Sequence, residues 1–579
     1  MSAQVSGTPR STGRFVAVLA CALITLAFVL CGCDFALDGG GSSDSSAASS
    51  SSSTSSSSKV QTFTPSGGSA TVTIKIASGS ENKEAAEAIQ HAVDASGVAV
   101  EIHYMGSLDI MGVLKDGGDD YDAVWPASSI WISLGDTSHL VKDAESTSTT
   151  PVVFGVSKAK AIELGWADSS GATKQVSTSD IITAVQNGQL TFSMTSATQS
   201  NSGASAYLAF LSALSGESGP LTADDLQNEE VTSQVKELLS GVDRSSGSSD
   251  WLKDMVVSDP ENHQAMVNYE SLVIQANKEL EAKGADPLLA IYPSDGIAIS
   301  DSPLGYVDRG QGSTVKDAFD SFQSALEDDE AKLLLERVGR RCGLGGKLAN
   351  PDDEEVSRAF RSDWGITTDA SVLKSVPMPA ADVITQALQL YQSDLRKPSY
   401  TIWVVDYSGS MYGEGKDGVV EGLTEALDPE RSAASMIQPG EQDVNVLVPF
   451  SSSVHDICTV TGTDTSELLD LARSTSADGG TFLYPALEQA LELATQAEQS
   501  GTYTVAIVAM TDGMSTYDEK DEFEDSYRNS GTTVPIFSIM FGDADSSQLD
   551  ELAELSNGKV FDGREGDLAD VFRQVKGYN

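Results

Sequence analysis

Between residues 71 and 345, short apolar runs alternate with longer stretches of helical periodicity. The sequence TVTIKI at 71–76 alternates as a strand does, a turn of small residues follows at 77–80, and a helical pattern extends from Lys83 to about Ala95. Further strand-like runs lie near residue 100, before Ser129, from Pro151 and from Leu190. This alternation predicts a parallel α/β sheet whose ligands gather beyond the carboxyl ends of the strands.

A second alternating region begins at Tyr400. TIWVV is an apolar β-branched run typical of a buried central strand, and TVAIVAM further along is another. The remaining expected elements are a lead-in helix at 377–395, a strand at 444–449, a helix at 465–473, a late strand at 534–542 and a closing helix at 567–575. We therefore predict an α/β domain over residues 380–579, with a doubly wound, mostly parallel sheet flanked by helices.

Oxygen-bearing side chains follow the two apolar strands of this domain. Asp406, Ser408 and Ser410 come directly after the first strand, and Asp512 ends the second in Thr-Asp-Gly. Thr481 lies between them in Gly-Gly-Thr, 75 residues after Asp406 and 31 before Asp512. Because the carboxyl ends of parallel strands share one edge, these side chains are expected to meet there, and they are the hard donors that Mg²⁺ prefers.

The ordered set DYSGSM, GGT and TDG resembles the metal-ion-dependent adhesion site of von Willebrand factor A domains. The resemblance implies that Ser408, Ser410 and Thr481 bind Mg²⁺ directly in some states, with Mn²⁺ or Ca²⁺ as alternatives. Asp406 and Asp512 would act directly or through water. One coordination position would stay open for a Glu or Asp of a partner protein or matrix.

Two other interpretations of this motif stay open at the sequence level. A single DxSxS pattern also fits a capped strand-to-helix turn. A bound ion would support hydrolysis only beside a positioned base, and the conspicuous candidate is the adjacent pair His455-Asp456. Neighbours in sequence seldom orient one another as a catalytic pair, so we expect no enzymatic activity.

The middle region, 70–345, carries a turn that suits an anion. Ser200-Asn201-Ser202-Gly203 precedes an apolar helical run, which would point backbone N–H groups and hydroxyls at one spot. With NYESLV at 268–273 and LAIYPSDG at 289–296, this region resembles the two-lobed extracytoplasmic solute-binding proteins of the sulfate and molybdate type. The resemblance implies a cleft for a small polar or anionic solute, lined by Ser78, Ser80, Ser128, Ser129, Ser200, Asn201, Ser202 and Tyr269. Serine-rich turns also serve simply as helix caps.

Residues 346–379 are interpreted as a connector.

The N-terminus has the layout of an export signal. Sixteen uncharged apolar residues at 15–30 follow two arginines and end in Leu-Cys-Gly-Cys, which resembles the bacterial lipobox with Cys33 as the lipidated residue. The alternative is an uncleaved membrane helix. We interpret 1–33 as a signal peptide and 34–69 as a flexible stalk rich in Ser and Gly. Both readings place the protein on the extracytoplasmic face of the cell membrane.

The net charge and the positions of the cysteines exclude some kinds of partner and metal. The 579 residues carry a formal charge of −49, which would repel phosphate backbones, so we expect no nucleic acid partner. The five cysteines and five histidines are too scattered for a zinc site. A disulfide between Cys342 and Cys458 stays open.

Together these features favour a lipid-anchored surface protein that binds an acidic residue of a protein or matrix partner through a divalent metal. The alternative function is an extracytoplasmic solute receptor for uptake or sensing, with the A-type domain docking it to a membrane partner.

Overall fold

The computed structural model describes residues 59–579 except 119, 516–518, 543–545, 565–567 and 579. The expected signal peptide, Cys33 and most of the stalk lie outside these residues. None of the helices among the described residues is both long and apolar enough to cross a membrane. Three sheets of six strands each organise the described part of the chain.

The first sheet forms one lobe of the middle region, with strand order β1-β3-β2-β4-β12-β5. Its strands are β1 (Val60–Phe63), β2 (Thr73–Gly79), β3 (Ala99–Met105), β4 (Ala123–Trp125), β5 (Val141–Ser146) and β12 (Pro303–Val307). Its helices are η1 (Ser80–Ala85, 3-10), α1 (Ala86–Ser96), α2 (Ser107–Lys115), α3 (Ser129–Gly135), α11 (Ser313–Leu326) and α12 (Asp329–Arg337). Buried side chains of β2, β3, α1 and α11 form its main core.

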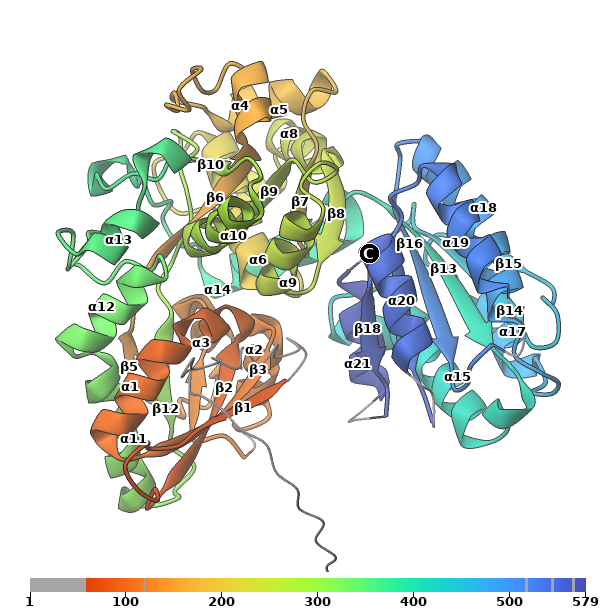
Figure 1. Cartoon of the computed structure of the whole chain (residues 1–579), viewed down its shortest axis with the longest axis horizontal. Helices are drawn as coiled ribbons and strands as arrows, with labels where there is room; N and C mark the ends of the chain where they lie inside the picture. The colour runs from red at the N-terminus through yellow and green to blue at the C-terminus, as the bar shows by residue number, and fades with distance from the viewer. Residues whose placement is uncertain (1–58, 119, 516–518, 543–545, 565–567, 579) are drawn as a thin grey trace, which may run out of the picture. The chain divides into compact units, whose positions relative to one another are not determined.

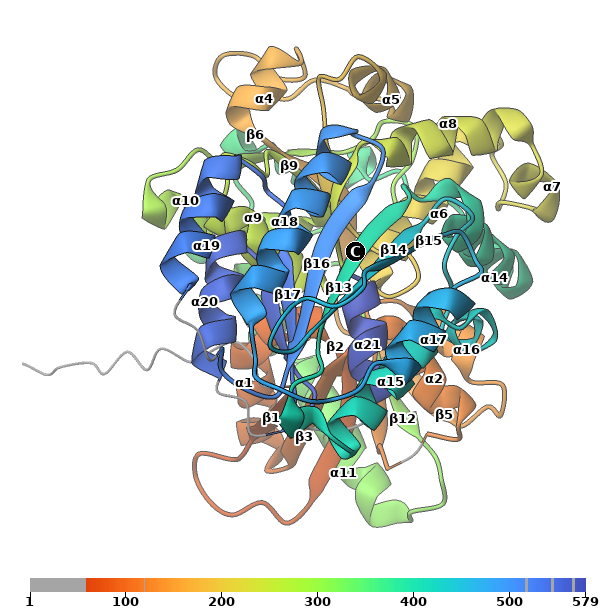
Figure 2. The same ribbon diagram turned by 90° about the vertical axis from the view of Figure 1, so that its right-hand side faces the viewer.

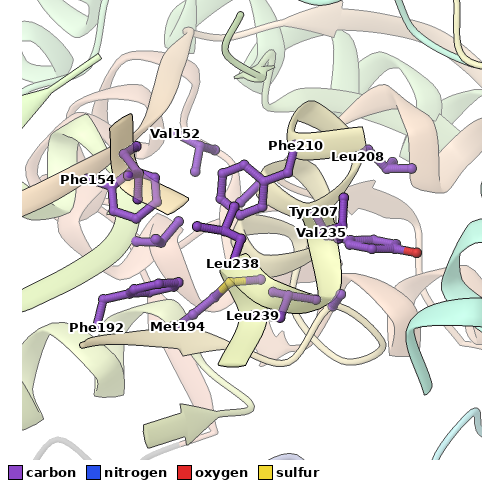
Figure 3. Close-up of a cluster of buried hydrophobic side chains, with 14 of the residues drawn as sticks. Val152, Phe154, Phe192, Met194, Tyr207, Leu208, Phe210, Val235, Leu238 and Leu239 are labelled. Atoms are coloured by element: carbon purple, nitrogen blue, oxygen red, sulfur yellow. The ribbon is translucent and has the colours of Figure 1, made fainter. Parts of the chain in front are cut away.

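The second sheet forms the other lobe, in the order β10-β6-β9-β7-β8, with β11 also paired to β6. Its strands are β6 (Thr150–Ser157), β7 (Phe192–Thr195), β8 (Val242–Ser246), β9 (Ala265–Tyr269), β10 (Leu288–Ile291) and β11 (Ile299–Ser300). Its helices are α4 (Lys158–Glu163), α5 (Thr178–Gln186), α6 (Asn201–Ser215), α7 (Ala223–Leu226), α8 (Glu229–Ser240), α9 (Ser249–Ser258) and α10 (Glu270–Lys283). Figure 3 shows part of its core, where aromatic residues of β6, β7 and α6 meet leucines of α8.

The sheets of the two lobes are mixed, where the sequence predicts parallel ones. The expected parallel pairing holds between β2 and its neighbours β3 and β4, and between β7 and β8 or β9. β6, β10 and β12 pair antiparallel with their neighbours. In the first sheet the antiparallel strand is β12, which enters the sheet after the chain has left the lobe at β5 and passed through the second sheet.

Two adjacent arginines lie where the lobes join, and each serves a different lobe. Arg340 Nε donates to Glu84 of the first lobe at 2.8 Å, and Arg341 Nε donates to Glu270 of the second at 2.7 Å. Both guanidinium groups are about 99% buried. Arg341 also forms a backbone bridge with Thr149, in the segment that crosses between β5 and β6. The lobes are thus tied together beside their crossing segments.

The segment after the second lobe folds back onto it. It contains α13 (Glu354–Ala359) and the 3-10 turns η2 (Ser362–Trp364) and η3 (Ala370–Val372). Val356, Phe360 and Trp364 share a buried cluster with residues of α9 and α10. Cys342 and Cys458 are both free thiols.

The third sheet has the order β15-β14-β13-β16-β17-β18, and every pair is parallel except β14 with β15. Its strands are β13 (Ser399–Asp406), β14 (Val444–Phe450), β15 (Cys458–Thr461), β16 (Thr504–Thr511), β17 (Ile536–Met540) and β18 (Lys559–Asp562). Its helices are η5 (Gly409–Met411), α15 (Glu414–Leu427), α16 (Pro429–Ala434), α17 (Ser466–Ser474), α18 (Leu483–Gln499), α19 (Lys520–Ser530), α20 (Ser546–Ser556) and α21 (Leu568–Lys576). The expected lead-in helix, α14 (Ala381–Leu390) with the π turn η4 (Tyr391–Leu395) that continues it, packs into the core of the second lobe. Helices α18, α19 and α20 cover one face and α15, α17 and α21 the other (Figures 1 and 2). This is the doubly wound architecture that the sequence predicts.

Candidate metal centre

Asp406 ends the central strand of the third sheet and is completely buried. Strand β13 pairs in parallel with β14 on one side and β16 on the other, and Val405 lies opposite Met510. The loops after Asp406 and Thr511 therefore leave the same edge of the sheet. Apolar β-branched residues on both strands fix this position, because they fit only the fully covered centre of the sheet.

Both oxygens of the Asp406 carboxylate already accept hydrogen bonds. The backbone N–H of Ser408 donates to Oδ1 at 2.7 Å, and the Thr511 hydroxyl donates to Oδ2 at 2.6 Å. Burial raises the pKa of Asp406, and the nearby charge of Asp512 raises it further. The carboxylate is thus fixed in orientation and electrostatically unfavourable without a cation nearby.

The hydroxyl groups of the first loop connect it to the Thr-Asp-Gly turn. The hydroxyls of Ser408 and Ser410 lie 3.1 Å apart, and Ser410 donates to Asp512 Oδ1 at 2.8 Å. Ser408 is buried, whereas Ser410 is exposed. Four of the five predicted ligands are therefore linked in one chain of contacts that opens to the surface.

Thr481 reaches the same edge on a loop that glycine makes possible. Gly479 has a φ of +81°, and a Cβ there would lie 2.5 Å from the Ser452 hydroxyl, so a side chain at this position would be strained and crowded. Gly479 accepts a hydrogen bond from the N–H of Gly409 at 3.1 Å. A Cβ at Gly513 would lie 3.9 Å from Thr481 Oγ1, which puts that hydroxyl beside the Thr-Asp-Gly turn.

The donor set fits a hard divalent cation. It consists of two carboxylates and three hydroxyls, all oxygen donors of the kind Mg²⁺ takes. Neither carboxylate forms an ion pair within the part of the chain that the structure describes. Among the same residues no group of three or more His, Cys, Asp and Glu side chains could hold a metal, so an ion here would rely on the hydroxyls.

Two residues of this centre escape prediction from the motif alone. Thr511 is the final strand residue and orients Asp406, and Ser452 accepts a hydrogen bond from the N–H of Gly480 at 2.7 Å. Thr511 stands directly before Asp512, which is the only signal the sequence offers. His455 contacts the Ser451 hydroxyl through Nε2 at 3.0 Å, and that serine is buried after β14.

The candidate solute residues of the second lobe form one buried network. Asn201 donates to the Tyr269 hydroxyl at 2.9 Å and to the Ser300 hydroxyl at 2.8 Å, and its carbonyl accepts from Trp131 of the first lobe at 2.7 Å. Ser200 and Ser202 both contact the hydroxyl of Ser249, at 3.0 and 2.7 Å. Ser249 and Ser300 are missing from the sequence prediction. Ser249 ends the run SSGSS at 245–249, a serine-rich turn at the start of α9 that resembles the one at the start of α6, whereas Ser300 carries no distinctive pattern.

The candidates of the first lobe divide into two groups. Ser80 lies 3.3 Å from the Ser248 hydroxyl across the lobe junction, and Ser78 accepts from Asn82 at 2.9 Å. Ser128 caps α3 by accepting from the N–H of Ile130, and Ser129 is exposed with its N–H donating to Asp301. The structure therefore brings Ser80 to Ser248 of the second lobe, keeps Ser78 bonded to Asn82 of its own lobe, and places Ser128 and Ser129 at the start of α3.

Two family models match the chain. One is described as a bacterial extracellular solute-binding protein and matches residues 74–341, which span the two lobes. The other is described as a von Willebrand factor type A domain and matches residues 401–561, which span the third sheet. No curated protein matches the sequence.

Solved structures resemble each part separately. A von Willebrand factor type A protein from Catenulispora acidiphila is 17% identical, with a TM-score of 0.27, over 31% of this chain and 42% of its own. This chain thus spans less than half the length of that protein. The substrate binding protein of the ABC transporter from Agrobacterium tumefaciens is 12% identical, with a TM-score of 0.39, over 57% of this chain and 98% of its own. Maltose-bound MalE3 from T. maritima is 12% identical, with a TM-score of 0.41, over 55% of this chain and 93% of its own.

Proposed function

We propose that this chain, which carries a bacterial solute-binding domain followed by a von Willebrand factor A domain, binds an acidic group of a protein or matrix partner through a divalent metal. The metal would be held by Asp406, Ser408, Ser410, Thr481 and Asp512. The supporting observation is the hydrogen bond between Ser410 and Asp512, residues 102 positions apart in the chain, at an exposed edge of the sheet.

The geometry supports direct metal binding by some of these residues and indirect binding, through water, by others. Both oxygens of Asp406 are occupied by Ser408 and Thr511, so this carboxylate would act on an ion through water rather than directly. The hydroxyls of Ser408, Ser410 and Thr481 would bind the ion. A bound Mg²⁺ would then be under-neutralised and would attract one more carboxylate, which a partner supplies.

The N-terminal sequence supports a location for this activity. The apolar run at 15–30 and the cysteine that follows it favour export and lipid anchoring at Cys33, which would hold both domains outside the membrane. Cells that express the full chain and a Cys33→Ala variant, fed labelled palmitate, would test the anchor. Equal label in both proteins would contradict it.

The binding function can be tested by affinity capture from cell-surface extract. The bait is the full chain, with Asp406→Ala as the test variant and Asp525→Ala as the control, because Asp525 is 79% exposed on α19. We expect one partner to be captured by the wild type and the control in Mg²⁺, and to be lost with Asp406→Ala or with EDTA. Capture that persists with both treatments would contradict the proposal.

A second candidate function, a solute receptor for uptake or sensing, is favoured by the polar network at the lobe junction. Asn201 accepts a hydrogen bond from Trp131 of the other lobe there, and Ser80 of that lobe contacts Ser248. Ser248 is the neighbour in sequence of Ser249, which Ser200 and Ser202 contact. Thermal unfolding of the full chain with small polar solutes tests it. A strong stabilisation by one solute is the expected result.

A further inference from the structure

A small polar cavity lies between the second lobe and the von Willebrand factor A domain. Its volume is about 20 Å³, slightly more than the roughly 10–15 Å³ that one water-sized particle needs. On the side of the second lobe it is lined by residues 196, 198, 199 and 245. Arg396, Ser399 and Lys576 line it on the side of the A domain. Within the part of the chain that the structure describes, no Asp or Glu lines this cavity.

Hydrogen bonds join the two domains on either side of Lys576. The Gln199 amide donates to the backbone carbonyl of Arg573 at 2.7 Å, and the Ser245 hydroxyl donates to that of Gly577 at 3.2 Å. Lys576, between these two acceptors in sequence, is the last residue of α21. The cavity therefore belongs to an interface in which α21 is bonded to the second lobe.

Three hydrogen-bond donors of the lining residues have no partner. Lys576 is only 9% exposed, and its Nζ forms no hydrogen bond or ion pair with any described residue. Nε of Arg396 and the hydroxyl of Ser399 are buried and also lack a hydrogen-bond partner. Because the nitrogens of lysine and arginine can only donate, neither can serve as the partner of the other. The cavity therefore lacks an acceptor.

The charges around the cavity leave one positive charge uncompensated. Asp443 is the only carboxylate among the described residues whose charge acts on Lys576 or Arg396. It forms a two-fold ion pair with Arg396 and also accepts from the backbone N–H groups of Ser399 and Gly440, both at 2.8 Å. Arg396 and Asp443 thus neutralise each other. Burial lowers the pKa of Lys576 to about 8, which still leaves it mostly protonated at neutral pH.

A single small anion fits these features better than other occupants. A metal ion would be repelled by the excess positive charge. Sulfate or an organic acid has several heavy atoms and exceeds the volume. A water molecule has two lone pairs for three donors, and it leaves the buried ammonium without a counter-charge, which is costly.

We propose that the cavity binds one monatomic anion of the size of chloride, held by Lys576, Arg396 and Ser399. The ion neutralises the ammonium of Lys576 and so stabilises the packing of α21 against the second lobe. The site requires neither the metal centre nor a bound solute.

Chloride NMR on the full chain tests the inference, because exchange with a bound ion broadens the chloride line. The test variants are Lys576→Met, which removes the charge at similar size, and Ser399→Ala, which removes one donor. The control is Lys115→Met, at an exposed position of α2. We expect broadening that bromide abolishes in the wild type and the control, no broadening in Lys576→Met, and a Kd raised about tenfold in Ser399→Ala.

Thermal unfolding gives a second measurement. Replacement of chloride by gluconate at constant ionic strength should lower the Tm of the wild type by about 2 °C or more, because gluconate is too large for the cavity. The Tm of Lys576→Met should be the same in both salts.

Three results would overturn the inference. Broadening that persists in Lys576→Met would place the anion elsewhere on the molecule. No broadening in the wild type, with equal Tm values in the two salts, would mean that the cavity holds water. If Lys576→Met does not fold, an unchanged Kd in Ser399→Ala would show that the ion does not occupy this cavity.

Discussion

The candidate metal centre and the junction between the lobes are both made of short polar turns, but they differ in what their side chains already contact. In the metal centre the chain of hydrogen bonds from Asp406 ends at Ser410 and Asp512, which reach the surface. At the junction Asn201 donates to Tyr269, Ser202 contacts Ser249, and all four residues are buried. The first group of side chains is therefore partly open to the surface, whereas the second is enclosed in the interior.

The largest effect is expected where the lobes are tied together. Arg341→Met leaves Glu270 charged and completely buried without its partner, which should lower the free energy of unfolding by about 3–5 kcal/mol. Urea denaturation measures it. The control is Arg358→Met, since the Arg358–Glu354 pair is 67% and 81% exposed and should contribute less than about 0.5 kcal/mol. Equal losses in both variants would mean that the buried pair does not hold the junction.

A second prediction concerns how the stability of the protein changes with pH because of one buried carboxyl group at the lobe junction. The pKa of Glu81 is raised from 4.5 to about 7 in the folded protein, so the folded state binds more protons between these values and stability falls as pH rises through them. Glu81→Gln removes this cost and should be more stable than the wild type by about 3 kcal/mol at pH 8. At pH 5 the difference should be small. Denaturation curves at both pH values check it, and an equal gain at both would contradict the assignment.

At the metal centre, Thr511→Val tests the support of Asp406. The change keeps the shape but removes the donor to Oδ2, which should weaken Mn²⁺ binding about tenfold by calorimetry and cost about 2 kcal/mol of stability. Thr504→Val, at the other end of the same strand, is the matched control. It should lower stability only slightly and leave the affinity for Mn²⁺ unchanged. Similar metal affinities in the two variants would argue against the role of Thr511.

The smallest expected effect concerns the loop that carries Thr481. Gly479→Ala forces a side chain into a left-handed backbone and against Ser452, which should destabilise the domain by about 1–2 kcal/mol. Gly501→Ala, also at positive φ but with open space around it, isolates the backbone strain. If the Thr481 loop positions a ligand, Mn²⁺ affinity should fall in the first variant and not in the second.

The two regions also differ in how far the sequence predicts them. β13 and β16 are recognisable from their apolar runs, and because parallel strands end at one edge, the convergence of Asp406 and Asp512 follows from strand order alone. The lobes are less predictable, because β12 joins the first sheet only after the chain has formed the second sheet, and it pairs antiparallel with β4. Residues such as Ser249 and Glu81 depend on how the two lobes meet, and no local pattern encodes that contact. Arg340 and Arg341 lie at the end of the predicted 70–345 region, and their charge gives no sign in the sequence that both side chains are buried.

The arrangement of these two arginines constrains how the protein can diversify. Because neighbouring residues salt-bridge to Glu84 in one lobe and Glu270 in the other, neither lobe can be exchanged by recombination without its own acidic partner. A breakpoint anywhere between β5 and α12 would join an arginine to a foreign lobe and leave a charge buried alone. Homologous exchange is therefore expected to preserve the two lobes as one inherited unit.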